Sequence, residues 1–386
     1  MLKIISSELF SRGLLWIRVL LIGSLVDIES YGYLLLLISA EAIFGTIVSY
    51  PQIKEILFKH QVDARHFYST GILYLLLLPV ILCAAYLYFN SSAAMLAISL
   101  SVFFFAGSQT ALYVLRVANV SLYNRTKVYA AVLSTVVFMV ALPYNPNFLP
   151  LSTATYFFVL FGAFIRSSEK MAFDCKISIR ELIPGWLIFG SKSLLTQLGL
   201  QGNRFVIGVA LSIGDVAIFV KSYMIASGIT FIYAAIMIKY EKGLSKEIAP
   251  NELKPRLRKS FGVAGLMCAL LLAYIGVLFV FWDSKIPSVD QAFKDASSEL
   301  VLIFSLFFIF QAFSLAFTPV LIASGKNFWS LMATVFSLLV QVLVIICLWE
   351  NLTLSTLAWS MVLGHVVLVG TLVLGNIGSV RSQKHQ

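Results

Sequence analysis

Long apolar stretches separated by short polar ones dominate the chain. A helix that crosses a bilayer needs about 20 mostly apolar residues, because the hydrocarbon core is about 30 Å thick and each residue rises about 1.5 Å. We count twelve such stretches, at 9–26, 31–50, 69–89, 92–115, 128–143, 148–165, 183–211, 214–238, 260–282, 299–323, 328–349 and 352–377. The apolar residues come in runs and do not alternate, which favours helices. The pattern therefore predicts an all-α polytopic membrane protein.

Composition narrows the possibilities further. Of the 386 residues, 60% are hydrophobic and 12% are charged, whereas an average soluble chain carries about 25% charged residues. This balance excludes a water-soluble enzyme. The four cysteines lie far apart without a Cys-x-x-Cys pair, so neither a disulfide framework nor a zinc site is indicated, and we expect no metal and no cofactor.

Lysine and arginine predict the orientation of the helices, because positively charged segments stay on the cytoplasmic side. With the N-terminus inside, most of the 28 lysines and arginines fall on the cytoplasmic side, and only Lys285 and Lys294 fall outside. Twelve spans place both termini in the cytoplasm. The net charge of +10 follows from the same bias, so it indicates no nucleic-acid partner. A basic cluster at 254–259 fits an ordinary cytoplasmic loop or, as the alternative, a site for anionic membrane lipids.

The chain divides into two similar halves. The polar stretch 166–181 separates six predicted helices from six, which predicts an N-terminal bundle (1–166), a cytoplasmic linker (167–181) and a C-terminal bundle (182–386). In each half an acidic outer turn, at Asp27 and at Asp215, precedes the second helix. Because each half has an even number of spans, the repeats have parallel topology. This 6+6 arrangement favours a central cavity.

Three segments resemble a known family. They are 18–33, the segment 201–219 with Arg204-Phe205 and Asp215-Val216, and the small-residue turn 323–327. They resemble the bacterial polysaccharide or O-antigen (Wzx-type) flippases of the multidrug, oligosaccharidyl-lipid and polysaccharide exporter superfamily. The resemblance implies a transporter, not an enzyme, in the bacterial inner membrane. Its expected substrate is a lipid-linked oligosaccharide, and other polysaccharide-assembly membrane proteins are expected partners.

Two charged residues in the first half lie at membrane depth, where an unpartnered charge costs several kcal/mol. Arg18 lies about 12 Å from the outer end of the first predicted helix, and Glu41 about 15 Å from the outer end of the second. If the first two predicted helices are antiparallel neighbours, Arg18 and Glu41 lie at a similar depth in the membrane. The sequence leaves two roles open for Glu41: an ion-pair partner for Arg18, or a protonatable carboxylate that couples transport to an ion gradient. Arg18 is in addition a candidate for substrate binding.

The second half places cations at similar depth without an acid to match them. Gln197, Gln201 and Arg204 are spaced i, i+4 and i+7, which puts them on one helical stripe. Lys221 lies in the next predicted helix. A positively charged interior suits a diphosphate or an acidic sugar, because arginine binds phosphate with two hydrogen bonds. We therefore predict that Arg18, Gln197, Gln201, Arg204 and Lys221 bind substrate.

Two other functions remain open. A polysaccharide polymerase or ligase of the same pathway would also have many helices, but such enzymes resemble one another in a large outer loop, and the longest outer segment here is 283–298. A multidrug exporter of the same superfamily would carry cations, which a positively charged interior repels. Because the chain has no phosphate-binding loop of the Gly-x-x-x-x-Gly-Lys-Ser/Thr type, we expect an ion gradient and not ATP to drive transport.

Overall fold

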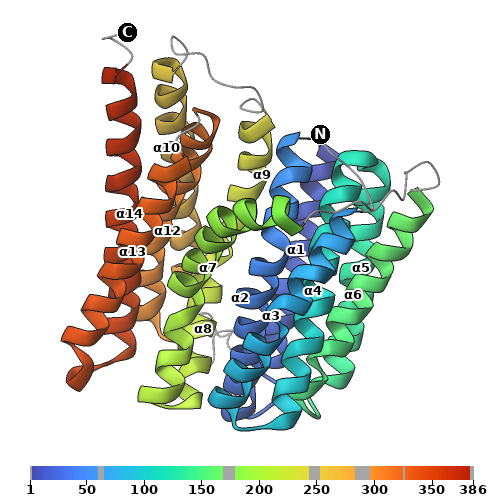
Figure 1. Cartoon of the computed structure of the whole chain (residues 1–386). Helices are drawn as coiled ribbons and strands as arrows, with labels where there is room; N and C mark the ends of the chain where they lie inside the picture. Colours follow the sequence, from blue (N-terminus) through green and yellow to red (C-terminus); the bar gives the residue numbers. More distant parts are fainter. Residues whose placement is uncertain are drawn as a thin grey trace. The chain divides into compact units, whose positions relative to one another are not determined.

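The computed structural model describes residues 2–59, 65–167, 179–242, 253–282, 296–324 and 327–382, which are mostly helical (Figure 1). The long helices are α1 (Leu2–Ile22), α2 (Ile28–Lys59), α3 (Arg65–Phe89), α4 (Ser92–Ala118), α5 (Val120–Ala141), α6 (Leu149–Ser167), α7 (Ile179–Ala210), α8 (Ile213–Ser227), α9 (Thr230–Lys242), α10 (Leu253–Trp282), α12 (Ser298–Ala323), α13 (Asn327–Cys347) and α14 (Leu354–Ser382). Two short 3-10 helices, η1 (Pro146–Phe148) and η3 (Trp349–Asn351), precede α6 and α14. The predicted all-α fold is confirmed.

Each predicted stretch corresponds to helix in the structure, but one prediction needs correction. The stretch 214–238 is not a single continuous helix: α8 and α9 meet at a break of two residues and are bent by 46°. The break lies at Gly228 and Ile229, between the last residue of α8 and the first of α9. A glycine in the middle of a helix weakens it, and the apolar pattern on both sides gives no sign of the bend.

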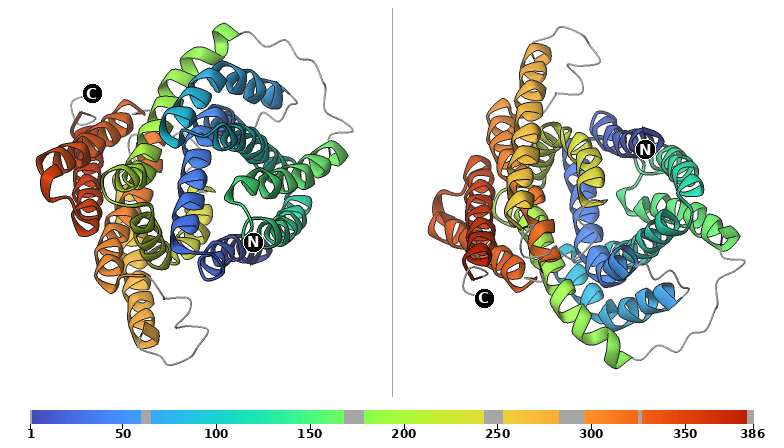
Figure 2. Two further views of the ribbon diagram at one scale, coloured as in Figure 1. Left: turned by 90° about the horizontal axis from the view of Figure 1, so that it is seen from below. Right: turned by 90° about the horizontal axis from the view of Figure 1, so that it is seen from above.

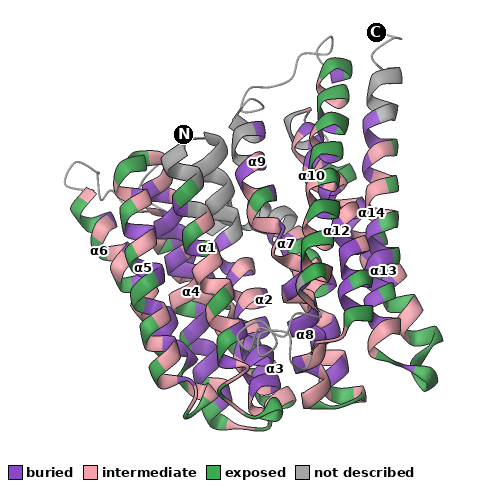
Figure 3. Cartoon of the chain, turned by 180° about the vertical axis from the view of Figure 1, so that it is seen from behind, coloured by how far each residue is buried: buried purple, intermediate pink, exposed green. Residues whose placement is uncertain are grey.

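Eight helices of the described chain are long and apolar enough to cross a membrane, or nine with the bent pair counted as one span. The predicted total of twelve also includes α1, α5 and α7, which carry charged residues inside their length, such as Arg12 and Arg18 in α1. Figure 3 shows that burial differs among the spans: α2, α4 and α12 are the most buried, whereas α3 and α10 expose most of their apolar side chains. Exposed apolar faces of this kind suit lipid contact.

Contacts within the chain divide it into two compact units, Met1–Gln201 and Gly202–Gln386. The division falls inside α7, later than the predicted linker at 167–181. Most of that linker, as well as Lys285, Lys294 and part of the turn 323–327, lies outside the described residues. The predicted domain boundaries therefore stay a prediction, and each unit has its own core.

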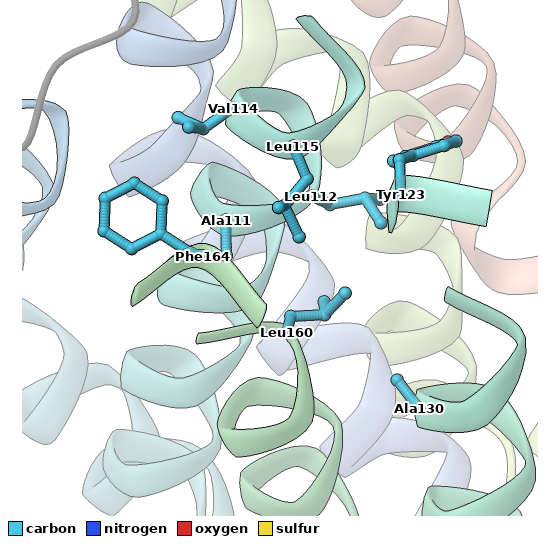
Figure 4. Packing of buried hydrophobic residues seen from close by; sticks show 8 residues of the cluster. All are labelled: Ala111, Leu112, Val114, Leu115, Tyr123, Ala130, Leu160 and Phe164. Atoms are coloured by element: carbon cyan, nitrogen blue, oxygen red, sulfur yellow. The ribbon is translucent and has the colours of Figure 1, made fainter. Parts of the chain in front are cut away.

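In the first unit, α4 is the central helix. It packs against α2, α3 and α6, while α5 packs against α1 and α6; Figure 2 shows these helices end on. A buried cluster joins α4, α5 and α6, with Leu112, Leu115, Tyr123, Leu160 and Phe164 among its members (Figure 4). In the second unit, α12 packs against α8, α10 and α14.

The two acidic turns, at Asp27 and Asp215, both cap helices. The backbone N–H of Ser30 donates to Asp27 at 2.8 Å at the start of α2, and this hydrogen bond lowers the pKa of the Asp27 carboxyl. At the start of α8, Ser212 accepts from the N–H of Asp215 at 3.0 Å and donates to its carboxylate at 2.7 Å. An acidic or hydroxyl side chain satisfies the free N–H groups of a helix start. The sequence similarity between the two turns therefore reflects a shared structural role.

Candidate functional sites in the two units

In the first unit, Arg18 on α1 reaches toward α5, the helix against which α1 packs. Its guanidinium donates to the hydroxyl of Ser134 at 3.2 Å and lies over the ring of Phe138, 4.6 Å from the centroid. Ser134 and Phe138 are four residues apart on one helix, so both face the same neighbour. The Arg18 Nε atom is buried without a hydrogen-bond partner. Arg18 thus keeps one donor available for a ligand or a water molecule.

Glu41 on α2 is buried, with 8% of its surface exposed. The hydroxyl of Thr153 on α6 lies 3.3 Å and 3.4 Å from its two carboxylate oxygens. The same hydroxyl also donates to the carbonyl of Leu149 in its own helix at 3.3 Å. Thr153 therefore gives Glu41 a shared hydrogen bond, which is weak at these distances.

The structure brings Arg18 and Glu41 into one polar cluster of the first unit. The two side chains are close enough to interact electrostatically. Among the hydrogen bonds and ion pairs of the described residues, however, none joins Arg18 directly to Glu41; Arg18 bonds to Ser134, and Glu41 to Thr153. The two charges thus act on each other at longer range than a contact ion pair.

The predicted stripe of polar residues lies on α7, which is an unbroken helix from Ile179 to Ala210. Gln197, Gln201 and Arg204 therefore keep the spacing that places them on one face. The division between units falls directly after Gln201, so the two glutamines belong to the first unit and Arg204 to the second. The Gln201 Oε1 atom is buried without a hydrogen-bond partner, which makes it available to a hydroxyl donor.

In the second unit, Arg204 is buried with 7% of its surface exposed. Its guanidinium lies over the ring of Tyr223 on α8, 5.7 Å from the centroid. Tyr223 in turn packs edge-on against Phe304 of α12, with 5.2 Å between ring centroids, and against Phe308 at 5.4 Å. Aromatic neighbours of this kind fix the ring, and a ring face attracts a cation. The result is an arginine held in a defined position inside an aromatic environment.

Lys221 is also on α8 and is nearly inaccessible, with 2% of its surface exposed. It lies two residues before Tyr223, and successive residues of a helix are turned by about 100°. Lys221 and Tyr223 therefore leave α8 on nearly opposite sides. The structure gives Arg204 an aromatic partner in Tyr223 but does not place Lys221 beside the same ring.

The sequence did not point to Ser134, Phe138, Thr153 or Tyr223. Each is an ordinary residue for a membrane helix, and its role depends on which helix packs beside it. The i, i+4 spacing of Ser134 and Phe138 is the one local signal that could have suggested a common partner. Within the described residues, no group of three or more histidine, cysteine or acidic side chains is arranged to hold a metal ion.

Comparisons with known proteins identify the fold. No family model matches the sequence, and no curated protein matches it significantly. Solved structures do match over almost the whole chain. An outward-facing multidrug resistance MATE family transporter of the MOP superfamily has a TM-score of 0.66 at 15% identity, covering 100% of this chain and 96% of its own.

Two further structures agree with the first. An inward-facing MATE family transporter of the same superfamily has a TM-score of 0.59 at 16% identity, covering 100% of this chain and 96% of its own. A eukaryotic MATE transporter has a TM-score of 0.65 at 14% identity, covering 98% and 96%. This chain therefore has the fold of the MATE transporters, which are multi-pass membrane proteins and not enzymes.

Proposed function

We propose that this protein is a flippase for lipid-linked oligosaccharides. It carries a polyprenyl-diphosphate-linked repeat unit, of O-antigen or capsule type, from the cytoplasmic to the periplasmic leaflet of a bacterial inner membrane, with both termini in the cytoplasm. The MATE-like fold supports a transporter, and the resemblance of 18–33 and 201–219 to the polysaccharide flippases supports this substrate class. Membrane lipids and other polysaccharide-assembly membrane proteins are its expected partners.

The buried arginine of the second unit carries the proposal. Arg204 lies at membrane depth over Tyr223, and Asp215, at the start of α8, is the only acidic residue between Gly190 and Ser227. A substrate diphosphate would supply negative charge where the chain itself supplies little. The attraction is strong there because the local dielectric is low, and a guanidinium binds phosphate oxygens with two hydrogen bonds. Gln201 and Gln197 on the same stripe of α7 would donate to or accept from sugar hydroxyls.

Alternating access would move the headgroup across while the lipid tail stays in the bilayer. The chain has no phosphate-binding loop for ATP, so an ion gradient would supply the energy. Glu41 is the candidate for this coupling because, among the described acidic residues of the first unit, it is the buried one. Arg18, in the same cluster, would hold the anionic group or set the charge that Glu41 experiences.

Deleting the gene tests the direction of transport. The lipid-linked repeat unit should accumulate as single units in the cytoplasmic leaflet, where a membrane-impermeant probe of the sugar reaches it only after the cells are opened. Accumulation of single units in the outer leaflet would instead identify a later step, which is the polymerase or ligase alternative. The location of the accumulated substrate separates the two functions.

Neutralising the buried cations tests the site. Arg204→Gln should lower the rate of flipping in proteoliposomes by roughly tenfold or more, because losing a charged hydrogen bond costs about 1.5–3 kcal/mol. Lys221→Gln is measured separately, since Lys221 leaves the other side of α8. Arg116→Gln, at the end of α4, is the control because it removes the same charge outside the buried sites. Unchanged flipping by folded Arg204→Gln protein would remove Arg204 from the mechanism.

A multidrug exporter is the second candidate, because two of the solved structures that share the fold are multidrug resistance MATE family transporters. Buried cations such as Arg204 and Lys221 would repel cationic drugs. Expression in a drug-sensitive strain should therefore leave susceptibility to cationic drugs unchanged. Resistance that disappears in an inactive variant would favour the exporter.

A further inference from the structure

The bend between α8 and α9 has an unusual hydrogen bond at its centre. In an unbroken α-helix each N–H donates to the carbonyl four residues before it, so Ile229 would donate to Ile225. Here the Ile225 carbonyl accepts from the hydroxyl of Tyr274 on α10 at 2.7 Å and from the Gly228 N–H at 3.3 Å. In the described part of this turn, the Ile229 N–H does not donate to that carbonyl. A side chain from another helix thus occupies the acceptor that would continue the helix.

Side-chain hydroxyls also satisfy the neighbouring carbonyls. Ser227 donates to the carbonyl of Met224 at 2.8 Å, and Thr230 donates to the carbonyl of Ser227 at 2.7 Å. Inside a membrane, every backbone group that leaves a helix needs such a partner. The carbonyls of Met224 and Ser227 at the bend therefore have side-chain partners, which lowers the cost of the bend within the bilayer.

Gly228 leaves the space that the Tyr274 hydroxyl occupies. A Cβ atom built at Gly228 would overlap the Tyr274 hydroxyl, so only glycine lets that hydroxyl reach the Ile225 carbonyl. The requirement is one of space, since Gly228 has a right-handed helical backbone. The bend thus depends on two residues from different parts of the chain that fit each other.

We propose that Tyr274 is a positioning residue that holds the predicted span 214–238 in its bent form. This span, which consists of α8 and α9, is called span eight below. Its hydroxyl takes the place of the Ile229 N–H at the Ile225 carbonyl, and without it that N–H completes a straighter helix. Tyr223 and Lys221 lie in the two turns of α8 just before the bend, so the bend sets the position of the ring under Arg204. This last link rests on the proposed function, whereas the bend itself does not.

The test measures the bend directly. Nitroxide labels at Ile213 and Ile236, in a cysteine-free protein in nanodiscs, report the end-to-end distance of the bent span by pulsed electron resonance. Tyr274→Phe should lengthen this distance by about 2–3 Å, the difference between a span bent by 46° and a straight one at about 1.5 Å per residue. Gly228→Ala should give the same shift, because it displaces the same hydroxyl.

Tyr74→Phe is the matched control. Tyr74 on α3 donates to the Ser99 carbonyl of α4 at 2.9 Å, but α4 is unbroken, so losing this hydroxyl should not change the distance in span eight.

In the flipping assay, Tyr274→Phe should raise the apparent KM for the lipid-linked substrate roughly two- to tenfold with little change in maximal rate, because it displaces a binding group. Tyr74→Phe should change neither value.

The outcomes separate the two levels of the proposal. An unchanged distance in both Tyr274→Phe and Gly228→Ala would show that the hydrogen bond from Tyr274 to the Ile225 carbonyl does not hold the bend. A longer distance with unchanged KM would overturn the positioning role. If the wild-type protein flips no lipid-linked oligosaccharide, the proposed function fails, and the distance measurement still decides whether Tyr274 holds the bend.

Discussion

Two charged side chains of the first unit are held by residues of neighbouring helices. Arg18 on α1 is bound by Ser134 and Phe138 of α5, and Glu41 on α2 by Thr153 of α6. The attraction of a guanidinium to a ring face contributes about 0.5–2 kcal/mol, with the larger values at dry sites. Such contacts accommodate an arginine at membrane depth without neutralising it. The charge therefore stays available to act on the nearby carboxylate.

A substitution at Glu41 tests whether this carboxylate couples transport to the ion gradient. Glu41→Gln should leave the protein folded, since the amide oxygen still accepts from Thr153, but it removes the group that can exchange a proton. Flipping driven by an imposed ion gradient should then fall to the rate seen without a gradient. The measurement is the initial rate in proteoliposomes with and without the gradient. Glu29→Gln, at the exposed start of α2, is the control. If both variants respond to the gradient as the wild type does, Glu41 is not the coupling group.

Helices and their approximate ends were predictable from the sequence, because a bilayer forces apolar runs of sufficient length to be helical. The bend of span eight was not, because it depends on Tyr274, 49 residues beyond the carbonyl that it binds. The same reason limits the prediction of the sites. Arg18, Glu41, Arg204 and Lys221 stand out as charges in apolar runs, whereas Ser134, Thr153 and Tyr223 acquire their roles only when helices pack together.

Close packing of helices gives a prediction of its own. Gly107 on α4 faces α6, and a Cβ atom there would overlap the ring of Phe157. Gly107→Ala should therefore lower the free energy of unfolding of the first unit by about 1–3 kcal/mol, the usual cost of overpacking. Gly162→Ala, on α6 and with nothing within 4 Å of the added atom, should be neutral or slightly stabilising because alanine favours helix. Unfolding in detergent, followed by circular dichroism, compares the two; equal stability would mean that Phe157 moves aside freely.

Two criteria give different numbers of membrane-spanning helices for the molecule as a whole. Apolarity and length select eight or nine helices of the described chain, whereas the distribution of lysine and arginine predicts twelve crossings. The difference lies in α1, α5 and α7, whose charged residues lower their apolarity. In α5, Lys127 lies near the start of the helix and is buried, with its ammonium 3.4 Å from the Tyr123 hydroxyl. A cation placed near a helix end and bonded within the protein does not prevent that helix from crossing.

The sidedness of three exposed positions decides whether α5 crosses. Ser92 and Ala118 are the first and last residues of α4, which satisfies the apolar criterion, so single cysteines there should react from opposite sides of the membrane. Tyr144 follows α5 and is 86% exposed. If α5 crosses, a cysteine at position 144 should react with an impermeant maleimide on intact cells as the one at 92 does, and the one at 118 only after permeabilisation. If the cysteines at 144 and 118 instead react alike, α5 does not cross the membrane. Every later segment then lies on the opposite side from the one predicted. The basic segments of the second half would face outward, against the tendency of positive charge to stay in the cytoplasm.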